Sequence, residues 1–190
     1  MLKRYAFILL LCLVGLQSCD SASVSSETVV NMKDLKFVDN YYYLSDSLYT
    51  GKVISESSLT PLIAKEIFSV TQGRIDGLYQ QWTKEGNLRT ESTYKAGIKD
   101  GSQKGYHLNG HLSYEYTVTN GKREGIYLEY YPSGDLQIEN TYDKDSIIAQ
   151  KIFDIDGVTL ANYVIRDGRF YGFRGSSSCI NVMNEKYIDN

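Results

Sequence analysis

The sequence predicts an all-β fold, an open antiparallel meander of tandem β-hairpin repeats of 24 residues each. Three observations predict it. Pairs of glycines recur at a fixed spacing, short glycine-containing breaks separate runs rich in β-branched and aromatic residues, and apolar and polar residues alternate along those runs. Strands joined by such short breaks become antiparallel neighbours, which is why a meander is expected.

The repeat has a period of 24 residues between Gly73 and Tyr142. The stretches GRIDG (73–77), GIKDG (97–101) and GKREG (121–125) stand at this spacing. Four further columns follow the same spacing: Gly86, Gly110 and Gly134; Leu88, Leu112 and Leu136; Glu91, Glu115 and Glu139; Trp82, Tyr106 and Tyr130. A fixed internal period indicates units that stack on one another, because one hairpin alone cannot bury its apolar side.

One unit consists of two strands and two breaks. LYQQWT (78–83) and LRTESTY (88–94) resemble strands in composition, and KEGN (84–87) separates them. The equivalent breaks contain Asn-Gly or Pro-Ser-Gly, in which glycine supplies the positive φ that a hairpin turn requires. The GxxxG stretches are expected to reverse the chain between one hairpin and the next, with their two glycines bracketing the reversal.

Side-chain alternation predicts one apolar and one polar face. The glutamate column is expected on the polar face, and the leucine column on the apolar face together with Tyr94, Val118 and Tyr142. Tyr79 and Tyr127 fall on the polar side of this assignment, so we expect them to be exposed. Exposed tyrosine suits contact with a protein or glycan, and these two residues are therefore the candidate partner-contact residues.

The repeat pattern weakens toward both ends of the chain. Residues 36–44 indicate a first strand, and beyond Tyr142 the places of the two glycines are taken by Asp145 and Ala149. Two further hairpin turns are predicted at DIDG (154–157) and RDG (166–168). Residues 35–190 are thus expected to form one repeat domain whose degenerate end units act as caps.

Two stretches carry a resemblance to a known family: YKAGIKDGSQKGYHLNGHLSYEYTV (94–118) and VTNGKREGIYLEYYPSGDLQIENTY (118–142). They resemble the MORN-variant repeat of the YwqK family, whose members are described as antitoxin components. Gln103 departs from the pattern, because the other units have tyrosine at this position. The resemblance implies an open, twisted run of hairpins with a binding or scaffold role, and it transfers no catalytic residue.

The N-terminal residues resemble a bacterial lipoprotein signal. Residues 1–18 begin with a charged Lys-Arg pair followed by an apolar core at 5–16, which is the proportion of a secretory signal and too short to span a bilayer. LQSC (16–19) resembles a lipobox, which implies that Cys19 is acylated and becomes the mature N-terminus. The alternative is an ordinary secretory signal with an incidental cysteine.

The remaining N-terminal residues and the cysteines agree with an anchored domain. Residues 19–34 are short, polar and serine-rich, as expected of a flexible tether between the lipid and the domain. After loss of the signal and acylation of Cys19, only Cys179 is left, so no intrachain disulfide is expected. The expected location is the bacterial cell envelope, at a membrane and leaflet that the sequence leaves open.

The charge balance excludes nucleic acid as an expected partner. Residues 19–190 hold 18 basic and 23 acidic residues without a basic patch that would neutralise phosphates. The lipid, and not the protein surface, is therefore expected to make the membrane contact.

No catalytic, metal or cofactor site is predicted. His107 and His111 bracket a turn and are the best candidates for a shared metal, but a zinc site usually needs three or four protein ligands. DIDG and DKDS (143–146) lack the regular oxygen ligands of a calcium loop and are interpreted as turns. No nucleophile, base and acid stand in a recognisable order, so an enzyme is not expected.

The function predicted from the sequence is that of a membrane-anchored lipoprotein whose hairpin-repeat sheet binds another protein or serves as a scaffold. One alternative is an antitoxin or immunity protein that neutralises a toxin, and another is a structural component of the envelope. The partner is accordingly expected to be a protein, either a toxin or an envelope component.

Overall fold

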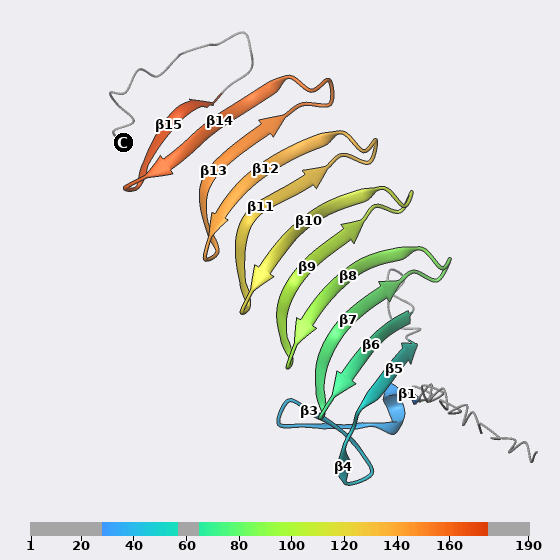
Figure 1. Ribbon diagram of the computed structural model, residues 1–190. Helices are drawn as coiled ribbons and strands as arrows, with labels where there is room; N and C mark the ends of the chain where they lie inside the picture. The colour runs from blue at the N-terminus through green and yellow to red at the C-terminus, as the bar shows by residue number, and fades with distance from the viewer. Residues whose placement is uncertain (1–27, 57–64, 175–190) are drawn as a thin grey trace, which may run out of the picture.

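The computed structural model describes residues 28–56 and 65–174 and confirms the predicted fold class (Figure 1). About 70% of these residues lie in strands, and consecutive strands form one long antiparallel sheet. The predicted signal peptide, Cys19, most of the tether and Cys179 lie outside the described residues. Within the described part of the chain, no helix has the length and apolar character needed to cross a membrane.

The strands form two sheets. The larger has twelve strands in the order β1 (Val29–Asn31), β5 (Gly51–Glu56), β6 (Lys65–Thr71), β7 (Arg74–Trp82), β8 (Leu88–Lys95), β9 (Ile98–Tyr106), β10 (Leu112–Thr119), β11 (Lys122–Tyr130), β12 (Leu136–Asp143), β13 (Ser146–Phe153), β14 (Thr159–Arg166) and β15 (Arg169–Arg174). The smaller consists of β2 (Lys36–Val38), β3 (Tyr41–Leu44) and β4 (Ser47–Leu48). From β5 onward every neighbouring pair is antiparallel, whereas β1 pairs with β5 in parallel.

Two kinds of turn line the two long edges of the larger sheet (Figure 1). Longer turns, such as residues 83–87, join the strands within each predicted hairpin, and two-residue turns join one hairpin to the next. In the turn between β8 and β9, Ala96 and Gly97 have φ values of 49° and 87°, the left-handed pair that a tight hairpin turn needs. This edge therefore matches the geometry of two-residue β-hairpins.

The prediction that both glycines of GxxxG bracket the reversal is wrong. The strand β9 already begins at Ile98, so the second glycine, Gly101, lies inside it at a φ of 100°. There the register between β8 and β9 shifts, because Ser92 pairs with Gln103 while Tyr94 pairs with Lys99. The first glycine thus makes the turn, and the second makes a bulge that increases the local twist.

The faces of the sheet also differ in part from the prediction. Cross-strand partners share a face, and Tyr79 pairs with Ser92 as Tyr127 pairs with Asn140. Tyr127 consequently lies beside Tyr142, on the side where the sequence placed apolar residues and not on the polar side. The error arose because strand alternation alone does not set the register between strands, which depends on turn length and bulges.

The leucine column was assigned to the wrong face for the same reason. Leu112 pairs with Tyr106, and Tyr114 pairs with Gly105. One extra residue of β10 therefore lies between these two pairs, and it reverses which side chains point to which face. Glu115 remains on the face opposite Tyr114, as predicted. We call the side with Tyr79, Tyr94, Tyr114, Tyr116, Tyr127, Tyr142 and Tyr163 the tyrosine face, and the other side the glutamate face.

A buried apolar cluster lies at the N-terminal end of the sheet. Residues 32–50, with a short 3-10 helix η1 (Met32–Asp34) and β2–β4, form an N-terminal cap over the first strands. Its Tyr42 packs against Phe68 of β6 with ring centroids 5.6 Å apart, and Phe68 and Val53 are 2% and 0% exposed. Beyond β7, no element among the described residues covers either face of the sheet (Figure 1).

Candidate functional site: the tyrosine face

The central row of the tyrosine face runs across the sheet from the cap to its far end. Cross-strand pairing places the following residues side by side in this row: Val53, Phe68, Tyr79, Ser92, Gln103, Tyr116, Tyr127, Asn140, Gln150, Tyr163 and Gly172. Aromatic and amide side chains dominate it. A row of this kind presents large, rigid contact groups together with hydrogen-bonding atoms, which is the composition of protein-binding surfaces.

The tyrosine rings touch one another along this row. Tyr79 stacks on Phe68 at a centroid distance of 5.5 Å and lies 5.8 Å from Tyr94. Tyr127 stacks on Tyr114 at 6.4 Å with an angle of 10° between the planes, and its ring is 5.5 Å from that of Tyr116. Such pairs stabilise by about 0.5–1.5 kcal/mol beyond the burial of area, so the rings partly replace the missing second layer.

The two tyrosines predicted to be exposed are in fact half-buried and hydrogen-bonded. The Tyr79 hydroxyl donates to Glu66 Oε1 at 2.7 Å, and the Tyr127 hydroxyl donates to Glu129 Oε2 at 3.0 Å. Burial raises the pKa of both phenols, and the neighbouring carboxylates raise it further because they disfavour a second negative charge. Both hydroxyls are therefore neutral donors at physiological pH.

Gly105 makes room for a tyrosine at the middle of this face. A Cβ atom at this position would lie 2.2 Å from the Tyr114 ring, closer than any real contact. The equivalent residues of the neighbouring units, Gln81 and Glu129, have full side chains. Tyr114 thus occupies in the middle unit the space that a side chain fills in the others.

Gln103, the departure from the tyrosine pattern, is almost completely buried at 1% exposure. Its Nε2 donates to the carbonyl of Thr93 at 3.1 Å, while its Oε1 has no hydrogen-bond partner among the described residues. A buried polar atom without a partner costs about 1–3 kcal/mol, so this position is a weak point of the face.

The glutamate column forms hydrogen bonds and ion pairs with side chains of the neighbouring strands. Glu91 accepts from Gln80 Nε2 at 2.9 Å, and Glu139 accepts from Lys151 Nζ at 2.8 Å. Glu115 accepts from the Tyr130 hydroxyl at 3.1 Å. In the described ranges, no group of three or more His, Cys, Asp or Glu residues is arranged to hold a metal ion.

The two histidines link neighbouring hairpins. A ring nitrogen of His107, Nε2, lies 2.8 Å from the carbonyl of Tyr130, and Nδ1 of His111 lies 2.8 Å from that of Pro132. In the next unit the Tyr131 hydroxyl donates to the carbonyl of Phe153 at 3.0 Å. Side chains of one long turn thus bind the backbone beside the next turn, and both histidines use a nitrogen in this way.

An acidic column that the sequence analysis missed links the short turns. Asp76 Oδ2 accepts from the Ala96 amide at 3.1 Å, and Asp100 Oδ2 accepts from the Asn120 amide at 3.1 Å. Glu124 binds the Lys144 amide in the same way at 3.3 Å. The signal was visible as the acidic residue before the second glycine of GRIDG, GIKDG and GKREG.

DKDS (143–146) and DIDG (154–157) lie at turns, as interpreted from the sequence. Lys144 and Asp145 form the two-residue turn between β12 and β13, with φ values of 47° and 71°. Asp145 Oδ1 accepts from the Arg123 amide at 3.0 Å and from Arg123 Nε at 3.2 Å, and these bonds lower the pKa of its carboxyl. In the later turn Asp154 Oδ1 accepts from the amide of Val158 at 2.8 Å.

Comparison with known families identifies the repeat. Residues 75–96, 99–120 and 123–144 match the family model described as the MORN repeat variant. The chain therefore carries three tandem MORN-variant repeats, which coincide with β7–β12 and leave out the cap, β1, β5, β6 and the last three strands. A search of curated proteins gives no match to the chain.

Proposed function

We propose that the chain is a lipid-anchored bacterial envelope protein whose MORN-variant sheet binds another protein through the tyrosine face. The observation that carries the proposal is the uncovered part of this face beyond β7. Under the cap its aromatic residues are buried by a second layer, whereas from β8 onward the same face has large aromatic side chains and no described element over them. Surfaces of this composition are where binding energy concentrates in protein interfaces.

The geometry also supports a protein and not a small molecule as the partner. The face is an extended, curved sheet whose hydroxyl and amide groups are already partly hydrogen-bonded, for instance Tyr163 to Gln150 at 2.6 Å. It offers many shallow contacts spread over several strands. An interface of about 800 Å² per partner needs such an area, while a small ligand needs a concave pocket.

Site-specific photo-crosslinking tests the binding face. A p-benzoylphenylalanine introduced in place of Tyr127 should give a discrete crosslinked product in intact cells. The matched control carries the same group in place of the neighbouring Ile126, which is 52% exposed on the glutamate face. Equal yields from the two positions, or no product from either, would contradict binding through the tyrosine face.

The identity of the crosslinked protein also distinguishes the antitoxin role from the structural role in the envelope. One stoichiometric toxin would support the antitoxin role that the family resemblance implies. A component of a large envelope complex would support the structural role.

The anchor is tested separately at Cys19. Acylation adds about 0.8 kcal/mol of membrane affinity per buried CH₂, and two or more chains give stable anchoring. Cys19→Ala should therefore move the protein from the membrane fraction to the aqueous fraction, and mass spectrometry of the wild type should find an acylated N-terminal cysteine. A wild-type N-terminus without lipid would refute the anchor and leave the binding face untouched.

A further inference from the structure

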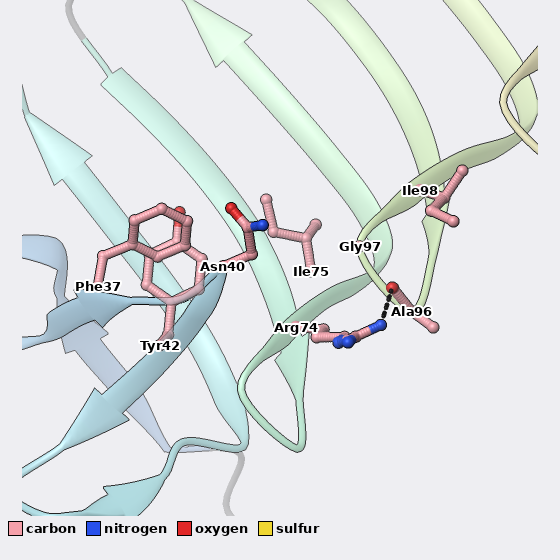
Figure 2. Close-up of a pocket in the computed structure, with 8 residues that line it drawn as sticks. All are labelled: Phe37, Asn40, Tyr42, Arg74, Ile75, Ala96, Gly97 and Ile98. Carbon is pink, nitrogen blue, oxygen red and sulfur yellow. Dashed lines mark hydrogen bonds between the residues drawn. The ribbon is translucent and has the colours of Figure 1, made fainter.

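A hollow of about 400 Å³ lies between the N-terminal cap and the short-turn edge of the larger sheet (Figure 2). Phe37 and Tyr42 of the cap form one wall, and Ile75 and Ile98 form the other. Its size falls within the range of about 300–1,000 Å³ for pockets that take a ligand or a partner side chain. The hollow is not a repeated feature of the sheet. Its first wall belongs to the cap, which has no counterpart beside the later units.

Two large apolar side chains in the walls of this hollow are more than half exposed to solvent. Phe37 and Ile98 are 57% and 54% exposed, although both are large and apolar. Each leaves apolar surface in water that burial would stabilise by about 25 cal/mol per Å². Two such side chains facing one hollow from separate elements differ from the scattered single exposed residues that any surface has.

A cation stands at the rim of the hollow. The Arg74 guanidinium donates to the carbonyl of Ala96 at 3.3 Å (Figure 2). It also donates to the Tyr41 hydroxyl, and its carbon lies 4.4 Å from the centre of the Tyr41 ring. Among the described residues, these contacts leave some of the five donors of the guanidinium without a bond. Within residues 28–56 and 65–174, no carboxylate makes an ion pair with Arg74. Asp76 on the same strand binds the Ala96 amide instead.

A second arginine shows what a neutralised site of the same kind looks like. Arg123 lies over the Tyr142 ring, also at 4.4 Å, and its charge is paired with Asp145 at 3.2 Å. Arg74 has the same aromatic support without the acid. A carboxylate of a partner would give Arg74 the same arrangement that Asp145 gives Arg123.

We propose that this hollow is an anchor site for an acidic segment of a protein partner that inserts one large apolar side chain next to a carboxylate. The apolar side chain fills the space between Phe37 and Ile98, and the carboxylate accepts from Arg74. The inference rests on the proposed protein-binding function and adds to it the chemistry of the partner and a second contact region. A fixed, stacked guanidinium is suited to this pairing because little of its freedom remains to be lost.

The probe is the capped peptide acetyl-Leu-Glu-amide, titrated into the full-length chain in detergent micelles with ¹³C-methyl-labelled isoleucine. The methyl signals of Ile98 and Ile75 should shift saturably, while that of Ile126 should not, although it is 52% exposed against 54% for Ile98. Acetyl-Leu-Lys-amide should bind about fivefold more weakly, because it places a second cation beside Arg74. Equal binding of the two peptides, or equal shifts of Ile98 and Ile126, would overturn the proposal.

Two variants complete the test. Ile98→Thr should weaken binding of the glutamate peptide about fivefold, whereas Ile126→Thr should leave it unchanged. The in-cell crosslinking experiment with the photo-reactive group at position 127 is then repeated in the Ile98→Thr variant. A lower yield of the crosslinked partner would show that the partner contacts both regions. An unchanged yield, together with no peptide binding, would refute the hollow as an anchor and leave binding by the tyrosine face standing.

Discussion

The first and the later strands of the sheet carry similar aromatic side chains but bury them in different ways. At the cap, Phe68 lies between two layers and is 2% exposed. In the repeats, Tyr127 lies on a single layer, half-buried by rings on the same face. The difference shows that a single-layer sheet compensates for the absent second layer with ring contacts along its face and hydrogen bonds along its edges. Stability is then a sum over neighbouring units and not a property of one central core.

The comparison is tested most strongly by Phe68→Ala. Removal of a fully buried phenylalanine should cost about 3–5 kcal/mol, because the two packed layers cannot close the cavity. Hydrogen exchange should accelerate most in β5–β7 and least in β13–β15, since each unit contacts only its neighbours. Tyr127→Ala should cost less and accelerate exchange locally. A uniform acceleration after Phe68→Ala would show one cooperative core and contradict the comparison.

A substitution in the open region, Gly105→Ala, should cost about 1–3 kcal/mol. The new Cβ atom would lie 2.2 Å from the Tyr114 ring and would displace it from the face. Chemical denaturation measures the loss. In the double variant with Tyr114→Ala, the cost of Gly105→Ala should largely vanish, because the clash is gone. Additive losses would mean that the ring does not depend on this glycine.

The raised pKa values of the tyrosines predict a loss of stability at high pH. Burial raises the pKa of several phenols above the ordinary value of 10.0, among them Tyr42, Tyr79, Tyr94, Tyr114, Tyr116 and Tyr127. A raised folded pKa means that the unfolded chain loses these protons first. The contribution of these phenols to the free energy of unfolding should therefore be fully present below pH 10.0 and fall above it as the phenols ionise.

Tyrosine-to-phenylalanine variants sharpen this test at the two regions. Tyr79→Phe near the cap and Tyr127→Phe in the repeats should each reduce the slope above pH 10.0, since each removes one ionisation. An unchanged slope in either variant would show that its phenol does not couple to folding.

The sequence predicted the regular part of this molecule because the repeat is encoded locally. Glycine pairs, turn residues and alternation lie within a few positions of one another, so strand order and hairpin boundaries follow from them. Register across strands is not local. One extra residue, such as Ser113 between two pairs of β10, reverses which side chains share a face, and this is why Tyr79 and Tyr127 were misplaced.

Two features were missed for different reasons: the three-stranded arrangement of the cap, where the sequence indicated a single strand over residues 36–44, and the acidic turn column. The cap occurs once, so no period reveals it, and the packing of Tyr42 on Phe68 joins residues 26 positions apart. The acidic residues Asp76, Asp100 and Glu124 do follow the period. Their role was hidden because their partners are backbone amides 20 residues further on, which a sequence does not display.

That acidic column gives a smaller effect than the buried positions. Asp100→Ala should cost about 1 kcal/mol, because an exposed side-chain acceptor for the Asn120 amide is lost while water replaces it. Asp143→Ala is the matched control, since this exposed acid of β12 makes no such bond in the described part of the chain. Equal costs measured by urea unfolding would show that the column does not link the turns.

The smallest change is expected at Gln103, despite its complete burial. Gln103→Leu removes the bond to the Thr93 carbonyl, which destabilises, and also removes the unpaired Oε1, which stabilises. The two effects oppose each other, so the free energy of unfolding should change by less than about 1 kcal/mol.

Asn140 provides the contrast in the same row. It is buried to a similar extent, at 5% exposure, but its Oδ1 accepts from Gln150 Nε2 at 2.8 Å. Asn140→Leu therefore leaves a donor without its partner and should cost about 1–3 kcal/mol. If Gln103→Leu proved as costly as Asn140→Leu, the Oε1 of Gln103 would have a partner in solution. Burial alone would then predict how much stability is lost when a polar side chain of this face is replaced by leucine. We expect instead that the loss depends on whether the buried polar atom is hydrogen-bonded.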